Sequence, residues 1–360
     1  MRYIGIIILL VLCLTLLLLT GCIVNTVIPE IASGNLENQE NTEEPVEDNP
    51  PSSSTGYVKW SGLGMGVFST ENTSEFDGYV DTLLANGFTE IRVDLSTWNY
   101  PAGVARTKVA AISAVAKGAN VIWGVGQWNG IPHGQPVFPP ITAANWEDYR
   151  QAILDAAQWA QDNGVYEFQI GNEEELHIDG TTMTVAGIIT NLKSVAIDVQ
   201  EIFTNGNVSY SCWQSSIDDW RTAGKGDIDI LASNVYIGGE GYYDNGWKTR
   251  ITNLVNGFGV NGTYLTEFAP SWSSLDDYSA DETVQTAAVT EMIEYIKASG
   301  MTRASYFAWK YEAFGVLKDD GTYRLLWNQA LLNTGPVEST TVPAKTATVS
   351  LPNTIALMPK

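Results

Sequence analysis

The chain has 360 residues and a formal net charge of −22, from 41 acidic and 19 basic side chains. So large an excess of negative charge argues against a partner such as nucleic acid or anionic lipid and favours a neutral one, such as an unsubstituted polysaccharide. Two of the three cysteines, Cys13 and Cys22, lie near the N-terminus. No disulfide framework is therefore possible, and a large hydrophobic core must stabilise the body of the chain.

The N-terminal residues predict export from the cytoplasm. Arg2 precedes an apolar stretch from Ile4 to Leu19, which is short for a membrane-spanning helix and fits the core of a signal peptide. Leu19-Thr20-Gly21-Cys22 then resembles the lipobox of prokaryotic lipoproteins, in which the cysteine becomes the lipidated N-terminus. We expect residues 1–21 to be a lipoprotein signal peptide and Cys22 to carry the lipid. An ordinary signal peptide, or an uncleaved anchor, stays open.

Residues 22–57 have the composition of a solvated linker. Between Ile23 and Tyr57 there are seven acidic residues and no Lys or Arg, and the segment ends in a run rich in Pro and Ser. It cannot bury enough apolar surface to offset the entropy of ordering. An anchor followed by a linker predicts a domain held at a membrane through lipid alone, outside the cytoplasm. At the other end, residues 337–360 form a tail rich in Thr and Pro.

Residues 58–336 alternate between β-prone and amphipathic helical segments, which predicts a parallel sheet with helical crossovers. Eight strand–helix pairs in about 275 residues match a single (β/α)8 TIM barrel. An open doubly wound sheet is the alternative, but we find no suitable glycine-rich phosphate-binding turn. The expected strands are Gly62–Phe68, Glu90–Leu95, Val121–Gln127, Glu167–Gly171, Val208–Cys212, Ile228–Tyr236, Thr263–Thr266 and Arg303–Ala308. The expected helices are Gly78–Ala85, Val104–Ala116, Trp146–Gln161, Val185–Phe203, Ile217–Thr222, Trp247–Val255, Glu282–Ala298 and Tyr323–Leu332.

Polar and aromatic residues gather where these strands end, which is the rim that carries function in a barrel. Glu173 follows the fourth strand directly after Asn172, and Glu267 follows the seventh. A carboxylate is costly to bury without partners, so two of them at strand ends are hard to explain as packing. The other candidates are Arg92 on strand two, Gln127 and Trp128 on strand three, Asn234 and Tyr236 on strand six, and Trp309 on strand eight.

This ordered set resembles the clan A glycoside hydrolases, especially the cellulase-like family 5, over roughly Trp60 to Gly335. The resemblance implies a retaining enzyme in which Glu267 is the nucleophile and Glu173 the acid/base. It implies substrate contacts for Arg92, Asn172, Tyr236, Trp309, Trp128 and Asn234. Family 5 members usually carry a histidine near the end of strand three and another before the strand-six tyrosine. Here those positions hold Gln127 or Trp128, and Asn234, so the family and the sugar stay open.

The chemistry explains these residue types. Retaining hydrolysis needs two carboxyl groups about 5 Å apart, one ionised and one protonated at the same pH. Arg92 and the Tyr236 hydroxyl would hold Glu267 as a carboxylate, and its charge would raise the pKa of Glu173. Alternatively, Arg92 pairs with Asp94 or Glu90, Tyr236 is rim packing, and Trp309 belongs to the core.

No cofactor or metal is implied. With only His133 and His177 present, neither a Ser-His-Asp triad nor a multi-histidine metal site is available. A metal cluster at Glu173, Glu174, Glu175 and His177 is disfavoured, because consecutive residues leaving a strand point in different directions.

We therefore predict a lipid-anchored, monomeric retaining glycoside hydrolase. It would act on β-glycosidic bonds of a β-glucan or β-mannan, by endo attack. An exo-acting β-glycosidase and a non-catalytic glycan-binding lipoprotein are the alternatives. A barrel enzyme using a Schiff-base lysine, for which Lys310 is the candidate, is a third.

Overall fold

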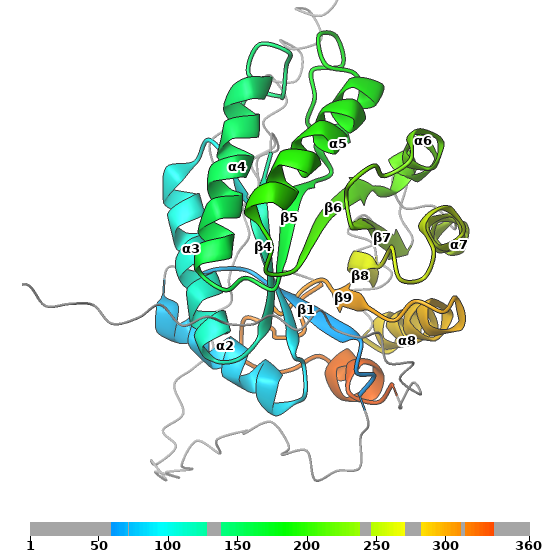
Figure 1. Ribbon diagram of the computed structural model, residues 1–360. Helices are drawn as coiled ribbons and strands as arrows, with labels where there is room; N and C mark the ends of the chain where they lie inside the picture. The colour runs from blue at the N-terminus through cyan, green and yellow to red at the C-terminus, as the bar shows by residue number, and fades with distance from the viewer. Residues whose placement is uncertain are drawn as a thin grey trace, which may run out of the picture. The chain divides into compact units, whose positions relative to one another are not determined.

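The computed structural model describes residues 59–70, 72–127, 138–237, 246–270, 282–310 and 314–334 (Figure 1). Eight parallel strands close into a barrel, because β1 pairs with both β2 and β9 and β2 pairs directly with β4. A two-residue strand, β3 (Ser96–Thr97), adds to β4 beside the ring. The barrel strands are β1 (Leu63–Val67), β2 (Glu90–Val93), β4 (Asn120–Gly126), β5 (Glu167–Asn172), β6 (Asn207–Trp213), β7 (Ile230–Ile237), β8 (Leu265–Pro270) and β9 (Ala304–Tyr306).

Helices surround the barrel and follow its strands in order (Figure 1). They are α2 (Thr73–Ala85), α3 (Pro101–Ala116), α4 (Trp146–Asp162), α5 (Val185–Ile202), α6 (Ile217–Ala223), α7 (Trp247–Phe258) and α8 (Glu282–Ala298). Two 3₁₀ turns, η2 (Glu174–Leu176) and η3 (Gln214–Ser216), follow β5 and β6. A short π-helix, η6 (Trp327–Leu331), comes last. None of the helices described is long and apolar enough to cross a membrane.

The TIM barrel predicted from the sequence is confirmed, and the boundaries differ at informative places. The sequence predicts a first helix from Gly78, whereas α2 begins at Thr73, because the Asn72 side chain accepts a hydrogen bond from the Ser74 N–H and caps the helix earlier. The expected strand Thr263–Thr266 ends before Glu267, whereas β8 runs through Glu267 to Pro270. In the expected helix Tyr323–Leu332, the helical part begins only at Leu325, and most of it is the π-helix Trp327–Leu331.

Some sequence predictions lie outside the described residues. They are the signal peptide, the Cys22 lipid site and the linker, which fall in residues 1–57, together with Trp128 and the tail 337–360.

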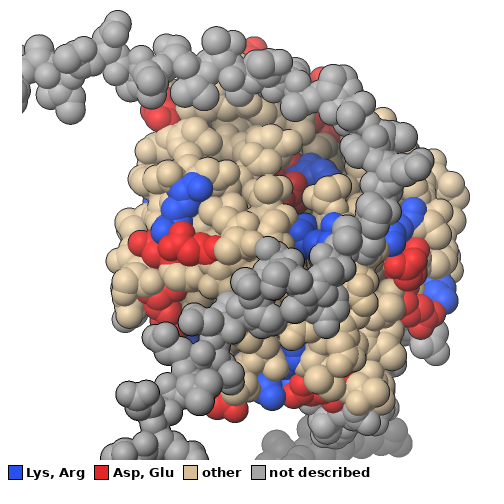
Figure 2. Space-filling model, turned by 90° about the horizontal axis from the view of Figure 1, so that it is seen from below, with Lys and Arg blue, Asp and Glu red and all other residues tan. Residues whose placement is uncertain are grey.

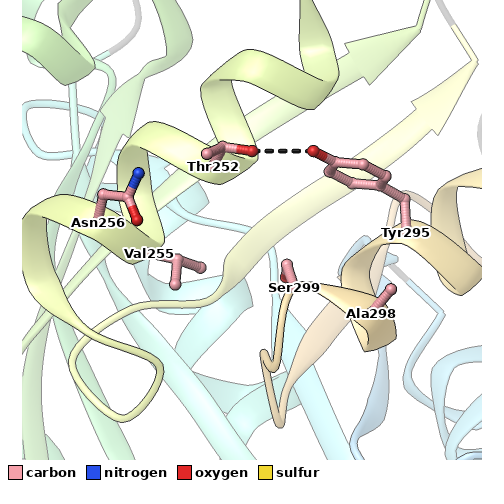
Figure 3. Close-up of a pocket in the computed structure, with 6 residues that line it drawn as sticks. All are labelled: Thr252, Val255, Asn256, Tyr295, Ala298 and Ser299. Carbon is pink, nitrogen blue, oxygen red and sulfur yellow. Dashed lines mark hydrogen bonds between the residues drawn. The ribbon is translucent and has the colours of Figure 1, made fainter.

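A small pocket lies in the outer layer of helices, and it is not the candidate site. A space of about 200 Å³ lies between α7 and α8, where the Thr252 and Tyr295 hydroxyls are 2.8 Å apart (Figure 3). Its lining comes from the second halves of both helices and includes no charged side chain. Helices of a (β/α)8 barrel run opposite to the strands, so this pocket lies towards the strand N-termini, away from the functional rim.

Surface charge is mixed on the face shown in Figure 2. Where that face is not grey, basic and acidic side chains lie side by side and do not form one continuous basic area. Ion pairs at the surface, such as Lys117–Asp81 and Lys248–Glu291, likewise set opposite charges side by side.

Candidate active site

Arg92 connects several of the polar side chains at the carboxyl ends of the strands. It lies on β2 and is only 4% exposed. Its guanidinium donates to Glu267 Oε1 at 2.7 Å through Nη1, and its Nε and Nη2 bond the side chains of Gln169 and Asn172, each at 2.9 Å. Three strands, β2, β5 and β8, are thereby tied together at one point. Of the alternatives for Arg92, the structure selects the pair with Glu267, not Asp94 or Glu90.

Both carboxylate oxygens of Glu267 have a donor. Arg92 binds Oε1, and the Tyr236 hydroxyl donates to Oε2. Glu267 lies opposite Asn234 in the β7–β8 register, directly after an irregularity in that pairing, and a second irregularity falls in the β8–β9 pairing. Such irregularities turn side chains locally. They explain how a residue inside a strand presents its carboxylate to the rim.

Glu173 leaves β5 in a conformation that few residues adopt. Its φ of 60° is the only positive φ of a non-glycine residue in the described chain, and its N–H bonds the Ser211 carbonyl at 2.8 Å. Such strain is found at functional sites more often than elsewhere. Burial raises the pKa of Glu173 well above its usual value, and the negative charge of Glu267 raises it further; the Asn234 hydrogen bond and Arg92 oppose the shift.

A polar network fixes the two asparagines beside these acids. Asn234 Oδ1 accepts from the hydroxyls of Ser211 at 2.9 Å and Thr266 at 2.8 Å. Its amide nitrogen is therefore the donor toward Asn172 Oδ1, at 3.2 Å, and toward Glu173. Asn172 Oδ1 is thus occupied by Arg92 and Asn234, so the amide nitrogen is the part of this side chain that is left to donate.

The structure contradicts one expectation from the sequence. Trp309 is 1% exposed, and its ring packs against Tyr79 and Trp327 in the core. A buried ring has no face to offer a sugar. β9 ends at Tyr306, earlier than the sequence predicts, so Trp309 lies beyond the strand.

Phe307, which sequence reasoning passed over, lies where an aromatic face was expected. It follows β9 directly, is half-buried, and its ring centroid is 6.1 Å from that of Tyr236, the partner of Glu267. Phe68 and Phe314 pack on its edge. Residues 304–306 are fully buried and Phe307 is the first half-buried residue after them, so a strand end placed at Tyr306 would have singled it out.

The neighbours of Glu173 in sequence, Glu174 and Glu175, are also buried. Glu174 accepts from the Tyr149 hydroxyl at 2.7 Å and the Gln127 N–H at 3.3 Å, and burial raises its pKa to about 7. A Cβ on Gly171 would meet its carboxyl at 2.5–2.6 Å, so any larger residue there would have to displace the Glu174 carboxyl. Burial also raises the pKa of Glu175, against the effect of its hydrogen-bond donors. The three acids point to different partners, and no metal-binding group of His, Cys, Asp and Glu occurs in the described residues.

Other rim residues turn out to be structural. The Gln127 side chain is 2% exposed and donates to the Pro139 carbonyl at 2.7 Å. Trp98 is half-buried and packs on Tyr149 at 5.8 Å.

Comparison with known proteins finds likeness in structure only. No family model and no curated protein matches the chain. An exo-β-1,4-mannosidase from Opitutaceae bacterium strain TAV5 matches with a TM-score of 0.56 and 12% identity, over 77% of this chain and 60% of that one. A family 5 xyloglucanase from Paenibacillus pabuli matches at 0.54 and 14%, over 76% and 97%. An endoglucanase from Thermotoga maritima matches at 0.53 and 14%, over 76% and 96%.

At sequence identities this low, the likeness in structure shows a shared fold alone. The chain spans 60% of the length of the mannosidase and nearly all of the xyloglucanase and the endoglucanase. The structural neighbours are thus glycoside hydrolases built on the barrel described above.

Proposed function

We propose that this chain is a retaining glycoside hydrolase that cleaves β-glycosidic bonds of a neutral polysaccharide, a β-glucan or β-mannan, by endo attack. Glu267 is the nucleophile and Glu173 the acid/base. The observation that carries the proposal is the pairing of unlike carboxyl groups at one rim. Glu267 is bound by a guanidinium and a phenol, whereas burial and the charge of Glu267 raise the pKa of Glu173 well above its usual value.

In the first step, Glu267 attacks the anomeric carbon while Glu173 gives its proton to the leaving oxygen. A glycosyl ester forms and the glycosidic C–O bond breaks. The negative charge on Glu267 is lost at this point, so Glu173 becomes more acidic. In the second step it accepts a proton from water as the water oxygen displaces Glu267 from the anomeric carbon. Both carboxyl groups are then restored to their starting states.

The neighbouring side chains have defined parts in this scheme. Asn172, whose Oδ1 is occupied by Arg92 and Asn234, presents its amide nitrogen to the sugar 2-hydroxyl. Phe307 replaces Trp309 as the aromatic face beside Tyr236. Trp128 is retained as a substrate contact on sequence grounds. No step requires a cofactor.

We also propose that the enzyme acts outside the cytoplasm, as a monomer held to a membrane by lipid on Cys22. The signal-like N-terminus and the acidic, cation-free linker support this placement.

The test is turnover of an aryl β-glycoside with a good leaving group. Wild-type protein should hydrolyse it, Glu267→Ala should be inactive, and Glu173→Ala should recover turnover with azide, forming the β-glycosyl azide. The azide works because the activated leaving group needs no acid, and the small anion occupies the space of the lost carboxyl. Wild-type rates in Glu267→Ala would overturn the assignment of Glu267 as the nucleophile. Absence of hydrolysis by the wild-type protein across glucan, mannan, xylan and chitosan would leave a glycan-binding protein. Product sizing on the polysaccharide that is cleaved separates endo from exo attack.

A further inference from the structure

Glu175 is a buried acid that the proposed chemistry does not yet use. It lies in η2, two residues after Glu173, and is 6% exposed. Burying a carboxyl without a partner is costly, so its surroundings should explain its presence.

Three groups surround the Glu175 carboxyl, and all of them donate. The Tyr210 hydroxyl and the Trp213 N–H reach Oε2 at 2.8 Å and 3.3 Å, and the Trp220 indole N–H reaches Oε1. An indole and a backbone amide can only donate. The Tyr210 oxygen already accepts the Glu174 N–H at 3.1 Å, which directs its own proton to Glu175.

This arrangement fits an anion and not a neutral acid. A protonated carboxyl would need an acceptor for its O–H, and none of the three groups supplies one. Within the described part of the chain, Glu175 forms no ion pair, so no cation cancels its charge. Glu175 therefore places an uncompensated negative charge close to the strand ends.

We propose that Glu175 is a positioning residue for Glu173, a fixed buried anion that keeps the proton on the acid/base and anchors its strained turn. The inference rests on the proposed function, in which Glu173 is the acid/base. Both residues are fastened to β6, Glu173 by its N–H to the Ser211 carbonyl and Glu175 by the Trp213 N–H. Like charges repel strongly where water is excluded, so ionisation of Glu173 is opposed.

The other groups that face Glu173 do not replace Glu175. Arg92 favours the ionised form, and the Cys212 thiol is neutral because burial raises its pKa well above the ordinary value. Glu267 opposes ionisation, but only until the glycosyl ester forms. Besides burial, Glu175 is the neighbouring charge that opposes ionisation of Glu173 in both steps, so Glu173 stays basic enough to accept a proton from water. The titratable groups that act on Glu173 are Arg92 of β2, Cys212 of β6, Glu267 of β8 and Glu175, and Tyr236 of β7 acts on Glu267. The titratable groups around Glu175 are Glu173, Glu174, Tyr210 and Cys212.

The test is the pH profile of kcat/KM on an aryl β-glycoside that needs protonation of its leaving group. In Glu175→Gln the alkaline limb should move down by roughly one pH unit, because one of two like charges is gone. Glu175→Asp keeps the charge and should bring the limb back toward the wild-type position, even with a lower kcat. Glu174→Gln is the matched control, since it alters an equally buried carboxyl of the same turn that contacts Tyr149 and Gln127 instead. A limb in Glu175→Gln that coincides with the wild-type limb overturns the inference.

A measurement on the unaltered protein covers the case in which Glu175→Gln does not fold. Carboxyl ¹³C NMR of glutamate-labelled wild-type protein, with Glu175 assigned from the aspartate variant, should find Glu175 ionised at pH 7 while Glu173 is protonated. A neutral Glu175 at that pH overturns the inference. Absence of wild-type hydrolysis defeats the proposed function instead, and the carboxyl titration still decides what Glu175 does to Glu173.

Discussion

Arg92 makes three contacts that a lysine cannot reproduce. Its planar guanidinium reaches Glu267, Gln169 and Asn172 in three different directions. Lysine carries the same charge on a single nitrogen, so Arg92→Lys should keep the ion pair and lose the fixed geometry. Hydrogen bonds to charged groups contribute about 1.5–3 kcal/mol each, so kcat/KM should fall on the order of 10²-fold or more.

The matched control is Tyr236→Phe, which removes the second donor that the described residues give Glu267 and leaves the ring that packs near Phe307. It should lower kcat/KM less than Arg92→Lys does, because one neutral donor is lost. Steady-state kinetics of both variants on one aryl glycoside provide the measurement. A larger loss in Tyr236→Phe would mean that Arg92 serves the fold and not the nucleophile.

For single residues, the sequence predicts the position of a side chain where a strand end determines it. It does not predict the position where this depends on how distant helices pack. Arg92 meets Glu267 because both lie on strands whose carboxyl ends form one rim, which the alternation of strands and helices predicts. Trp309 was misplaced because a strand end was drawn two residues too late. The burial of Glu175 by Tyr210 and Trp220 could not be foreseen, since it depends on how α6 packs against β6.

At the scale of elements, a buried charge cluster joins strands at the opposite end of the barrel. Arg303, just before β9, pairs with Glu90 of β2 at 2.8 Å and with Glu167 of β5 at 2.9 Å. Its guanidinium also lies over the Tyr264 ring, 4.2 Å from the centroid, while the Tyr264 hydroxyl donates to Glu167 at 2.7 Å. One cation thus neutralises two acids that start different strands.

Arg303→Met should destabilise the fold, because it removes the cation that pairs with both Glu90 and Glu167 and leaves Lys59 as a cation near Glu90. Removing one member of a buried ion pair costs about 3–5 kcal/mol. Urea unfolding monitored by tryptophan fluorescence measures the loss. Lys248→Met is the control, since Lys248–Glu291 is an exposed pair worth at most about 1 kcal/mol. Equal midpoints for the two variants would show that the cluster does not hold the barrel.

The helical elements show which parts of the fold are readable from sequence. In α5, Ile188, Leu192, Val195 and Val199 form the buried face that their spacing predicts. Ile197, although apolar, is 50% exposed on the same helix. The region from Tyr323 was misjudged because a π-helix shares its apolar composition with an α-helix. Composition and hydrophobic periodicity predict the long helices, but they do not predict the irregular last one.

For the whole molecule, the excess of acid has a consequence for stability against pH. Burial raises the pKa of Asp94 to about 6 and of Glu174 to about 7, above their usual values, and it raises the pKa values of Glu90, Glu173 and Glu175 in the same direction. A group whose folded pKa is raised stabilises the fold fully below its unfolded pKa and loses that contribution as pH rises through the folded pKa. His177 acts the other way, because burial lowers its pKa to about 4.

Between pH 8 and pH 6 the effect of these acids on the free energy of unfolding is larger than that of His177. As the pH falls from 8 to 6, protonation of Glu174 and Asp94 together adds roughly 2 kcal/mol to the free energy of unfolding. Proton uptake by His177 in the unfolded chain removes about 1 kcal/mol from it. Self-repulsion of a chain with net charge −22 also weakens as carboxylates are protonated. Stability should therefore rise by about 1 kcal/mol or more on going from pH 8 to pH 6, which corresponds to a Tm increase of roughly 2–4 °C.

Thermal unfolding at the two pH values, in low and in high salt, separates the two causes. High salt screens the surface charges and leaves the buried groups nearly untouched, so most of the increase in Tm should persist. Glu174→Gln should remove the larger part of that increase, because the amide does not titrate. A Tm that is higher at pH 8 than at pH 6 in both salts would mean that Glu174 and Asp94 are not protonated in the folded chain at pH 6. The protonated state assigned to Glu173, which shares their surroundings, would then lose its physical basis.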